Sequence, residues 1–476
     1  MTDDPQRVIA WFRRDLRIAD NRMLAAATAA GRRVFPVFVA DPARLDRHAR
    51  AAPRLSWFAA SLDALDERLR AHGSGLVVLH GEPAEVLRTF AAEVGAESVF
   101  AARDEDPHAA ARDRRVASAV NLRLVDDQRL VAPGELLSTA GEPFRVFTPF
   151  RRALDRRIEE DGDALAAEAR ADRGRLAPHP GTVKNAGEFP AGAPPVPLPD
   201  AGEGPASERL RAFSREDLRG YRRERDRPDL DSTSRLSPHL RVGSLSVRAA
   251  WRAALDAERE GSLAGDTELR DSARRWRDEL AWREFHAAVL DANPRIADES
   301  LRPEYGAISW EEGPEADAAL DAWHHGQTGY PIVDAGMRQL RATGWMHNRL
   351  RLITASFLVK DLGIDWRRGE AVFMEHLLDG DLAQNAGNWQ WVAGVGTDAA
   401  PYFRVFNPVL QGRRFDPHGT FVRTWLPELD GVHEQHLHEP WQAPPERRPR
   451  SYPEPIVDHG SARRRALDRY ASARAG

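Results

Sequence analysis

The sequence predicts two kinds of domain in one chain: an α/β domain with a doubly wound parallel sheet, followed by a larger all-helical domain. Short β-rich runs alternate with helical patterns near the N-terminus, whereas helix-period patterns dominate from about Ser207 to the end. A stretch crowded with Pro, Gly and Ala lies between them, from about residue 172 to residue 205. We therefore assign residues 1–135 to the α/β domain, 136–206 to a connector and 207–476 to the helical domain.

Five β-rich runs are the expected strands: 7–12, 34–40, 76–80, 98–103 and 122–126. Pro53 and Pro83 stand where the intervening helices would begin, and Gly73 and Gly95 stand where helices would end. Strands that alternate with helices form a parallel sheet with right-handed crossovers. No GxGxxG motif follows the first strand, so the dinucleotide-binding fingerprint is missing.

Composition limits the class of protein. Hydrophobic residues make up 42% and charged residues 30% of the 476-residue chain, as in soluble globular proteins. The chain has no Cys, which excludes disulfides, thiolate metal sites and Cys nucleophiles. We find no apolar run long enough to span a bilayer and no basic-then-apolar leader. We therefore expect a cytoplasmic protein without a membrane partner, and a monomer without a bound metal.

The net charge of -5 argues weakly against a protein coated in positive charge. Binding to a polyanion depends on the local arrangement of charges and not on their sum. Nearly every basic residue is Arg, since Lys184 and Lys360 are the only lysines. Arg offers a planar fork for phosphates, although a GC-rich genome is the commoner explanation for most of these arginines.

Two tracts, 345–349 (WMHNR) and 379–391 (DGDLAQNAGNWQW), combine aromatic and polar residues in an unusual way. Large rings need burial, and buried polar groups need hydrogen-bonded partners, so such a mixture predicts a walled polar site. On a helix, Asn348 and Leu352 share one face and Arg351 lies on the adjacent face. For Asn385 an alternative stays open, because the sequence from 384 to 388 is also a good turn sequence.

A second candidate site is the hydroxyl-rich segment from Thr233 to Pro238. Hydroxyls and backbone amides that lead into a Pro-started helix form a natural phosphate cradle, because unpaired amides and the helix dipole favour anions. Tyr221 would add a ring and a hydroxyl to the same place. An ordinary N-cap cluster explains the segment more simply.

A third candidate is the helical segment from Trp276 to His286. Trp276, Glu279 and Arg283 fall on one side of a helix with His286, and Trp282 lies at the edge of that face. A ring that stacks and an acid that reads a base edge would hold a nucleobase. The purely structural alternative is an amphipathic helix with core Trp residues and a solvent-exposed Glu-Arg pair.

Longer motifs resemble one known family. The segments 329–340 (GYPIVDAGMRQL), 344–366 and 397–408 (TDAAPYFRVFNP) are similar to class I cyclobutane pyrimidine dimer photolyases of the photolyase and cryptochrome superfamily. The resemblance covers nearly the whole chain and is weakest across the connector. It implies a light-driven repair enzyme for UV-damaged DNA, in which excited reduced FAD gives an electron to a flipped-out dimer.

The resemblance also implies roles for residues at matching positions. The FAD-binding residues would be Tyr221, Thr233, Ser234, Arg235, Leu236, Ser237, Trp276, Arg351, Asp379, Gly380, Asp381 and Asn385. The catalytic residues would be Glu279, Trp282, Asn348, Trp389 and Asn385. The DNA-binding residues would be Arg225, Glu279, Trp282, Arg283, Asn348, Arg349, Leu352, Arg404 and Gln411. An electron path to the flavin would run through Trp310, Trp366 and Trp389.

The chain departs from the family pattern at several positions. Leu352 stands where the family usually has Met, which is a volume-conserving change. Ala386 and Asn388 replace the usual Asn and Gly.

A second, light-harvesting chromophore is expected in the α/β domain. Ala109 replaces the Glu of folate-binding relatives and argues against methenyltetrahydrofolate. Asp104, together with Arg241 where deazaflavin-binding relatives carry Lys, favours 8-hydroxy-5-deazaflavin.

Two other functions compete with repair. A blue-light sensory flavoprotein of the cryptochrome type is the main alternative, and a purely structural or partner-binding helical protein is remote. Asn385 favours repair, because plant-type cryptochromes tend to carry Asp at that position. Glu279 and Trp282 would also be idle in a sensor.

Overall fold

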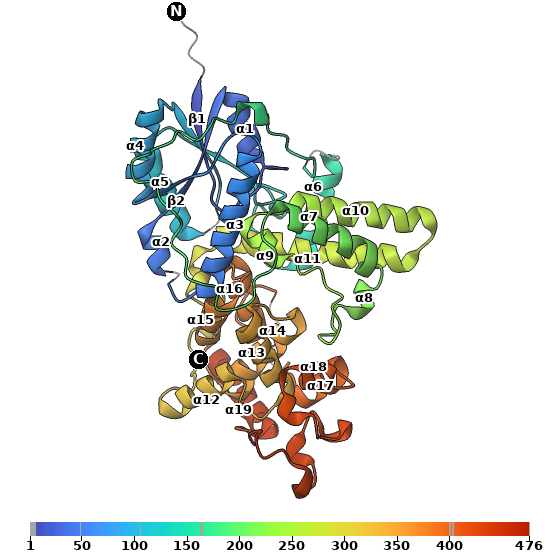
Figure 1. Ribbon diagram of the computed structural model, residues 1–476. Helices are drawn as coiled ribbons and strands as arrows, with labels where there is room; N and C mark the ends of the chain where they lie inside the picture. The colour runs from blue at the N-terminus through green and yellow to red at the C-terminus, as the bar shows by residue number, and fades with distance from the viewer. Residues whose placement is uncertain are drawn as a thin grey trace, which may run out of the picture. The chain divides into compact units, whose positions relative to one another are not determined.

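The computed structural model describes residues 6–47, 49–104, 106–161, 165–398, 401 and 404–475. The chain packs into two compact units, and each is described by itself (Figure 1). The first unit comprises Met1–Arg222 and Ser234–Ala292, and the second comprises Arg223–Thr233 and Asn293–Gly476. The domain boundaries expected after residues 135 and 206 rest on composition and stay a prediction.

The first unit contains a five-stranded parallel sheet with the strand order β3-β2-β1-β4-β5. The strands are β1 (Arg7–Trp11), β2 (Arg33–Ala40), β3 (Val77–His80), β4 (Ser98–Ala102) and β5 (Leu122–Val125). All five expected strands are confirmed, and no end differs from the expectation by more than one residue. Val8 pairs with both Val34 and Ser98, so β1 is the central strand and the strand order reverses beside it.

Helices cover both faces of this sheet, as a doubly wound fold requires. Figure 1 shows α1 and α3 on one face and α4 and α5 on the other. Pro residues begin α3, α4 and α5, and Gly95 ends α4 with a left-handed φ of 68°. These helices are α1 (Arg22–Ala30), α2 (Pro42–Arg47), α3 (Ala52–Arg70), α4 (Pro83–Val94) and α5 (Pro107–Ala119).

The predicted connector is ordered along much of its length. It contains the helix α6 (Phe147–Glu160), a 3-10 turn (Arg173–Arg175) and the start of α7 (Glu203–Ala212). Leu176 forms a parallel bridge with Val34, and Ala186 forms an antiparallel bridge with Leu79. The Pro/Gly-rich chain therefore packs against the sheet. The first unit also contains α9 (Ser237–Val242), α10 (Val247–Ala264) and α11 (Thr267–Ala292), of which α10 and α11 pack along their lengths.

The described residues of the second unit form helices joined by loops and contain no strand, which confirms the predicted helical domain. Its core is built around buried side chains such as Trp323, Met337, Leu350, Trp366 and Trp389. The helices are α12 (Pro314–His325), α13 (Pro331–Thr343), α14 (Asn348–Ser356), α15 (Trp366–His376), α16 (Leu382–Ala393), α17 (Pro408–Phe415), α18 (Thr420–Trp425) and α19 (His459–Ala475).

Shorter elements complete the chain. The helix α8 (Tyr221–Glu224) spans the boundary between the units, and π-helical turns cover Phe213–Asp217 and Phe357–Asp361. Short 3-10 turns cover Pro294–Ala297, Pro303–Tyr305, Pro427–Leu429, Glu434–His436, Pro440–Gln442 and Pro445–Arg447. Within the described ranges, no helix combines the length and the apolar character needed to cross a membrane.

Candidate functional site

A cavity of about 80 Å³ in the second unit brings together many of the expected site residues. Its walls come from α14, α15, α16 and the segment that leads into α16. Eight of the expected residues line it: Asn348, Arg351, Leu352, Asp379, Gly380, Asp381, Asn385 and Trp389. Asn348 of the tract 345–349 and several residues of the tract 379–391 therefore line one cavity.

Two polar residues begin the helices that present these side chains. His347 precedes α14, and its Nδ1 accepts a hydrogen bond from the Arg349 backbone N–H at 3.2 Å. Burial lowers the pKa of His347 to about 4, so the imidazole is neutral and can act as this N-cap. Asp381 caps α16 in the same way, accepting from the Gln384 N–H at 3.2 Å.

Arg351 and Asp379 form an ion pair at the cavity, with Nη2 and Oδ2 2.8 Å apart. Arg351 Nε also donates to the Met346 carbonyl at 2.9 Å, so the guanidinium is held from two sides. The Asp379 side chain is only 4% exposed, and its Oδ1 has no hydrogen-bond partner among the described residues. A buried acceptor without a partner costs free energy. Asp379 Oδ1 is therefore suited to a donor on a ligand.

Asn385 is held by Glu370 of α15. Its Nδ2 donates to Glu370 Oε1 at 2.8 Å and to the Glu370 carbonyl at 3.1 Å. Both amide hydrogens are used in this way, so Oδ1 is the atom that the amide can offer to a ligand, as an acceptor. The alternative that residues 384–388 form a turn is wrong, because α16 runs through them from Leu382 to Ala393.

Trp389 is buried, with 2% of its surface exposed. Its ring makes edge contacts with Phe373, at a centroid distance of 5.0 Å, and with Trp323, at 6.2 Å. Gly369 makes room for it, because a Cβ at that position would collide with the Trp389 ring. Trp366 is fully buried at the start of α15. Trp310 lies 6.5 Å from the ring of Tyr470, and the electron path through Trp310, Trp366 and Trp389 stays a prediction.

The expected residues of the third candidate segment all lie on α11 in the first unit. Trp276 is 3% exposed and packs edge-on against Phe213, with centroids 4.9 Å apart. Glu279 Oε1 lies 3.3 Å from Arg275 Nη2, four residues earlier. These two contacts are the ones expected for an ordinary amphipathic helix with a core Trp and a Glu-Arg pair. They are not by themselves evidence that Glu279 binds a ligand.

The other two α11 residues have different partners. Trp282 stacks face to face on Phe147, with ring centroids 3.8 Å apart. Arg283 Nη1 donates to the Gln128 carbonyl at 2.9 Å and lies 3.2 Å from Glu284 Oε1. Both side chains remain partly exposed.

The hydroxyl-rich segment directly precedes α9. The N-cap residue of α9 is Leu236, which makes no side-chain cap, so no hydroxyl caps this helix at that position. Arg235 adopts a left-handed φ of 49°, and Arg209 Nε donates to the Ser234 carbonyl at 2.9 Å. Ser237 is the first residue of α9. Tyr221 is buried, with its ring perpendicular to that of Phe213 at 5.7 Å.

The expected FAD-binding residues are thus divided between the units. Those in the first unit are Tyr221, Ser234, Arg235, Leu236, Ser237 and Trp276. Those in the second unit are Thr233, Arg351, Asp379, Gly380, Asp381 and Asn385.

Four expected DNA-binding residues lie elsewhere in the second unit. Arg349 Nη2 is 2.9 Å from Asp226 Oδ1, and its guanidinium lies 4.4 Å from the centre of the Phe415 ring. Arg225 Nε is 3.8 Å from the same carboxylate, so Asp226 brings the two arginines together. Arg404 is exposed, and Gln411 is partly buried on α17. Four residues of the 397–408 motif lie outside the described residues: Ala399, Ala400, Tyr402 and Phe403.

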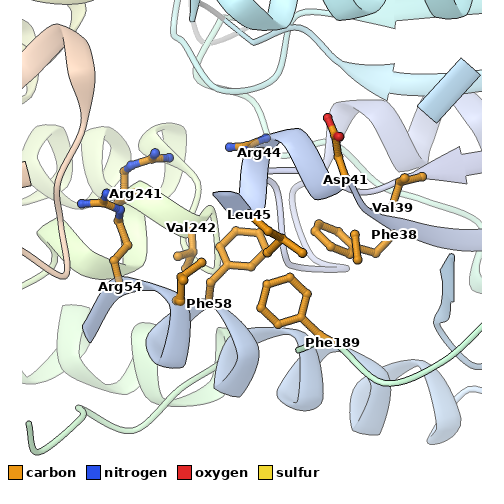
Figure 2. Close-up of a pocket in the computed structure, with 12 residues that line it drawn as sticks. Phe38, Val39, Asp41, Arg44, Leu45, Arg54, Phe58, Phe189, Arg241 and Val242 are labelled. Atoms are coloured by element: carbon orange, nitrogen blue, oxygen red, sulfur yellow. The ribbon is translucent and has the colours of Figure 1, made fainter. Parts of the chain in front are cut away.

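A second cavity, of about 50 Å³, lies in the first unit and includes the expected residue Arg241. Figure 2 shows the rings of Phe38, Phe58 and Phe189 gathered in it, with Arg54 and Arg241 beside each other at one end. Rings that can stack and two adjacent guanidinium groups suit a planar ligand that carries negative charge.

Asp104 lies just beyond β4, in a cluster of arginines. Its Oδ1 is 3.2 Å from Arg14 Nη1, and its Oδ2 is buried without a hydrogen-bond partner among the described residues. Burial alone would raise the pKa of Asp104, but the nearby charges of Arg14, Arg44 and Arg13 hold it well below its usual range. Arg44 also lines the second cavity. One of the charges that lower the pKa of Asp104 therefore belongs to the wall of that cavity.

Glu370, which holds Asn385 at the first cavity, and several residues of the second cavity were not expected from the sequence. Glu370 is an ordinary acid in a helical pattern, and no local signal marks it as the partner of Asn385. Arg54 follows Pro53 at the start of α3, where it reads as a surface residue. Phe189 lies in the Pro/Gly-rich connector, where there is no periodic pattern from which its position at the cavity could be inferred.

Comparisons with known proteins match both halves of the chain. A family model described as DNA photolyase matches residues 8–170, and one described as the FAD binding domain of DNA photolyase matches residues 276–472. A deoxyribodipyrimidine photo-lyase of Synechococcus is 40% identical over 95% of this chain and 94% of its own length. One from Agrobacterium fabrum is 39% identical over 98% of both chains.

Solved structures agree with these relatives. A bacterial class III photolyase from Agrobacterium tumefaciens superposes with a TM-score of 0.89 at 37% identity, covering 100% of this chain and 99% of that one. An archaeal photolyase from Sulfolobus tokodaii, solved with two FAD molecules, gives 0.80 at 31% identity, covering 98% and 100%. A cryptochrome from Synechocystis gives 0.86 at 29% identity, with the same coverage.

Proposed function

The chain belongs to the DNA photolyase family, and we propose that it is a light-driven repair enzyme that splits cyclobutane pyrimidine dimers in UV-damaged DNA. The observation that carries this proposal is the cavity of the second unit. Its polar walls include a buried carboxylate oxygen that has no hydrogen-bond partner in the described part of the chain, and an amide whose orientation Glu370 determines.

The residues of this cavity fit FAD. Asp379 Oδ1 needs a donor, which the imide N–H of a flavin ring can supply, and Asn385 Oδ1 is an acceptor for another ring N–H. Arg351 would hold Asp379 in place, and Asp381 would accept from the ring or from its ribityl chain. Reduced FAD, when bound and excited by light, supplies the electron that opens the cyclobutane ring and then returns.

This chain's own residues would bind and orient the damaged bases. Trp282 would stack on a flipped-out base while Glu279 hydrogen-bonds its edge and favours its radical anion. Asn348 and Leu352, which line the cavity, would contact the damaged DNA. Arg225, Arg349, Arg404 and Gln411 would contact the damaged strand, which is consistent with the shared position of Arg225 and Arg349 at Asp226.

We also propose that the cavity between Phe38, Phe58 and Arg241 binds a second, light-harvesting chromophore. Its aromatic walls and paired arginines favour 8-hydroxy-5-deazaflavin, a planar anionic ring, over methenyltetrahydrofolate. Reconstitution of the purified protein with each chromophore in turn tests this choice. If the spectra of the protein mixed with deazaflavin equal the sum of the two separate spectra, the deazaflavin does not bind and this choice is contradicted.

The subclass is also a proposal. The motifs favour class I, whereas one of the similar solved structures is described as a class III photolyase. The sensory alternative is supported by the similarity to a Synechocystis cryptochrome. Asn385 and the pair formed by Glu279 and Trp282 favour repair over a sensor.

One assay separates these possibilities. The purified protein should contain non-covalent FAD, and under blue light it should restore thymines from a duplex that carries one thymine dimer. A colourless protein that cannot be reconstituted with FAD would contradict the whole proposal. A flavoprotein that leaves the dimer intact under light would support the sensory alternative.

A further inference from the structure

Trp282 is held by a ring from the predicted connector. Phe147, the first residue of α6, lies parallel to the indole, with ring centroids 3.8 Å apart and an interplanar angle of 5°. This separation is van der Waals contact between two ring faces. One face of Trp282 is therefore covered, while the side chain as a whole remains partly exposed.

The position of Phe147 is itself determined by packing between α6 and α11. Phe285 lies edge-on to both stacked rings, at 5.9 Å from Phe147 and 5.6 Å from Trp282. Phe150, on the next turn of α6, is buried against Phe285 at 5.3 Å. An ion pair between Arg151 Nε and Asp278 Oδ1, 2.9 Å apart, also connects the two helices.

A ring that contacts a flipped-out base needs exposed surface and a defined plane. Holding a side chain in one rotamer before a ligand arrives reduces the entropy that binding must remove. Trp282 keeps some exposed surface, and Phe147 defines its plane by covering one face at contact distance. Phe285 lies edge-on to the indole, and the His286 ring lies 5.6 Å from it at an interplanar angle of 28°. We propose that Phe147 is a positioning residue of the lesion pocket, which fixes the plane of Trp282 so that the exposed part of the indole is held in place to contact a flipped-out base.

This inference rests on the proposed function, because it takes Trp282 as the platform for the lesion. It predicts that Phe147 acts through Trp282 and touches neither the cofactor cavity nor the phosphate-contacting arginines. The opposite role is a cover, in which Phe147 occupies the face that the base needs and must move away. The two roles predict changes of opposite sign in the affinity for damaged DNA.

The test is binding in the dark, when no repair occurs, to a duplex with one thymine dimer and to the same duplex without damage. Phe147→Ala should reduce the preference for the dimer by about 3- to 10-fold, as expected for the loss of an aromatic pair. Affinity for the undamaged duplex and the FAD content should not change. Phe147→Tyr should restore the preference, since it retains the ring.

Phe144→Ala is the matched control. Phe144 lies in the same segment and contacts Phe150, with centroids 5.9 Å apart, so its loss removes a ring beside the stack. That variant should keep the parent's preference for damage. If Phe147→Ala loses FAD, then Phe147→Leu, which keeps apolar volume without a ring, takes its place with the same expected result.

Tighter binding of the dimer by Phe147→Ala would identify a cover and overturn the inference. An equal loss on both duplexes would also overturn it. Trp282→Ala separates this failure from a failure of the proposed function. If Trp282→Ala keeps the preference for damage, the lesion face has been assigned wrongly. If only Trp282→Ala loses it, the positioning role of Phe147 alone is wrong.

Discussion

The cavity of the second unit and the α11 surface of the first unit differ in how they present polar groups. In the cavity, Asp379 and Asn385 are buried and held by Arg351 and Glu370. On α11, Glu279 and Trp282 remain partly exposed. Buried, fixed polar groups suit a ligand that stays bound, whereas exposed groups suit one that comes and goes. The difference supports the proposal that the cavity holds the cofactor and that Glu279 and Trp282 of α11 contact the lesion.

The largest expected effect concerns the transfer of an electron to FAD in the cavity. Trp366→Phe should abolish light-driven reduction of oxidised FAD, because it removes the middle ring of the predicted path. Repair should remain intact once the flavin has been reduced chemically. Absorbance of the flavin under illumination with an external reductant measures the first effect. Trp323→Phe is the control, since Trp323 also touches Trp389 but lies off the predicted path. Loss of photoreduction in that variant instead would mean that another route carries the electron.

A large effect is also expected when the ion pair of the cavity is broken. Arg351→Met leaves the Asp379 carboxylate without its cation, at a cost of about 1–3 kcal/mol, so FAD affinity should fall roughly 5- to 150-fold. Flavin absorbance per protein after dialysis measures the loss. Arg338→Met is the control, because it removes a 2.7 Å ion pair with Glu428 outside the cavity. Equal loss of FAD in both variants would mean that the pair acts only through overall stability.

The next effect concerns the phosphate contacts. Arg349→Ala should reduce the slope of log affinity against log salt by about 0.9 for one lost phosphate contact. Damaged and undamaged duplexes should weaken by similar factors, because a phosphate contact carries no information about the bases. Arg413→Ala, which removes an exposed pair with Glu439, is the control. A salt slope equal to the parent's in the Arg349 variant would place the DNA surface elsewhere.

A smaller, several-fold effect is expected on α11. Glu279→Ala should lower the repair yield per photon, because the acid would stabilise the radical anion of the flipped base. The FAD content should stay at the parent's level, in contrast to the Arg351 variant. Glu260→Ala, an exposed acid on α10, should change neither quantity. If this variant loses FAD while its remaining holoenzyme keeps the parent's repair yield, Glu279 acts on the cofactor and not on the lesion.

The smallest effect is expected at Leu352 on the cavity wall. Leu352→Met restores the residue usual in the family and conserves volume, so stability should change by less than about 1.5 kcal/mol. The repair yield should change little, because both side chains form the same apolar wall. Chemical unfolding and the photon yield measure the two quantities. A large gain in yield would show that a sulfur contact at position 352 contributes to repair and that Leu and Met are not equivalent there.

Much of this organisation could be predicted because it depends on periodicity. Alternating runs predicted all five strands to within one residue at each end, and helix spacing placed Asn348, Arg351 and Leu352 on one helix. Composition predicted a walled polar site from 345–349 and 379–391. At residues 384–388 the local pattern offered a turn as the alternative, and the tertiary structure has a helix. Packing around the cavity overrides a weak local preference there.

By itself, the sequence determined the fold class, the faces of the helices and eight of the residues that line the polar cavity. Only the tertiary structure decided their partners: Glu370 for Asn385, Phe147 for Trp282, and Asp226 for Arg225 and Arg349 together. The physical reason is that helical and strand patterns are set by neighbours a few residues apart. Contacts between elements depend instead on how those elements pack. A Phe in a connector belongs to no periodic hydrophobic pattern, so its partner cannot be inferred from the sequence.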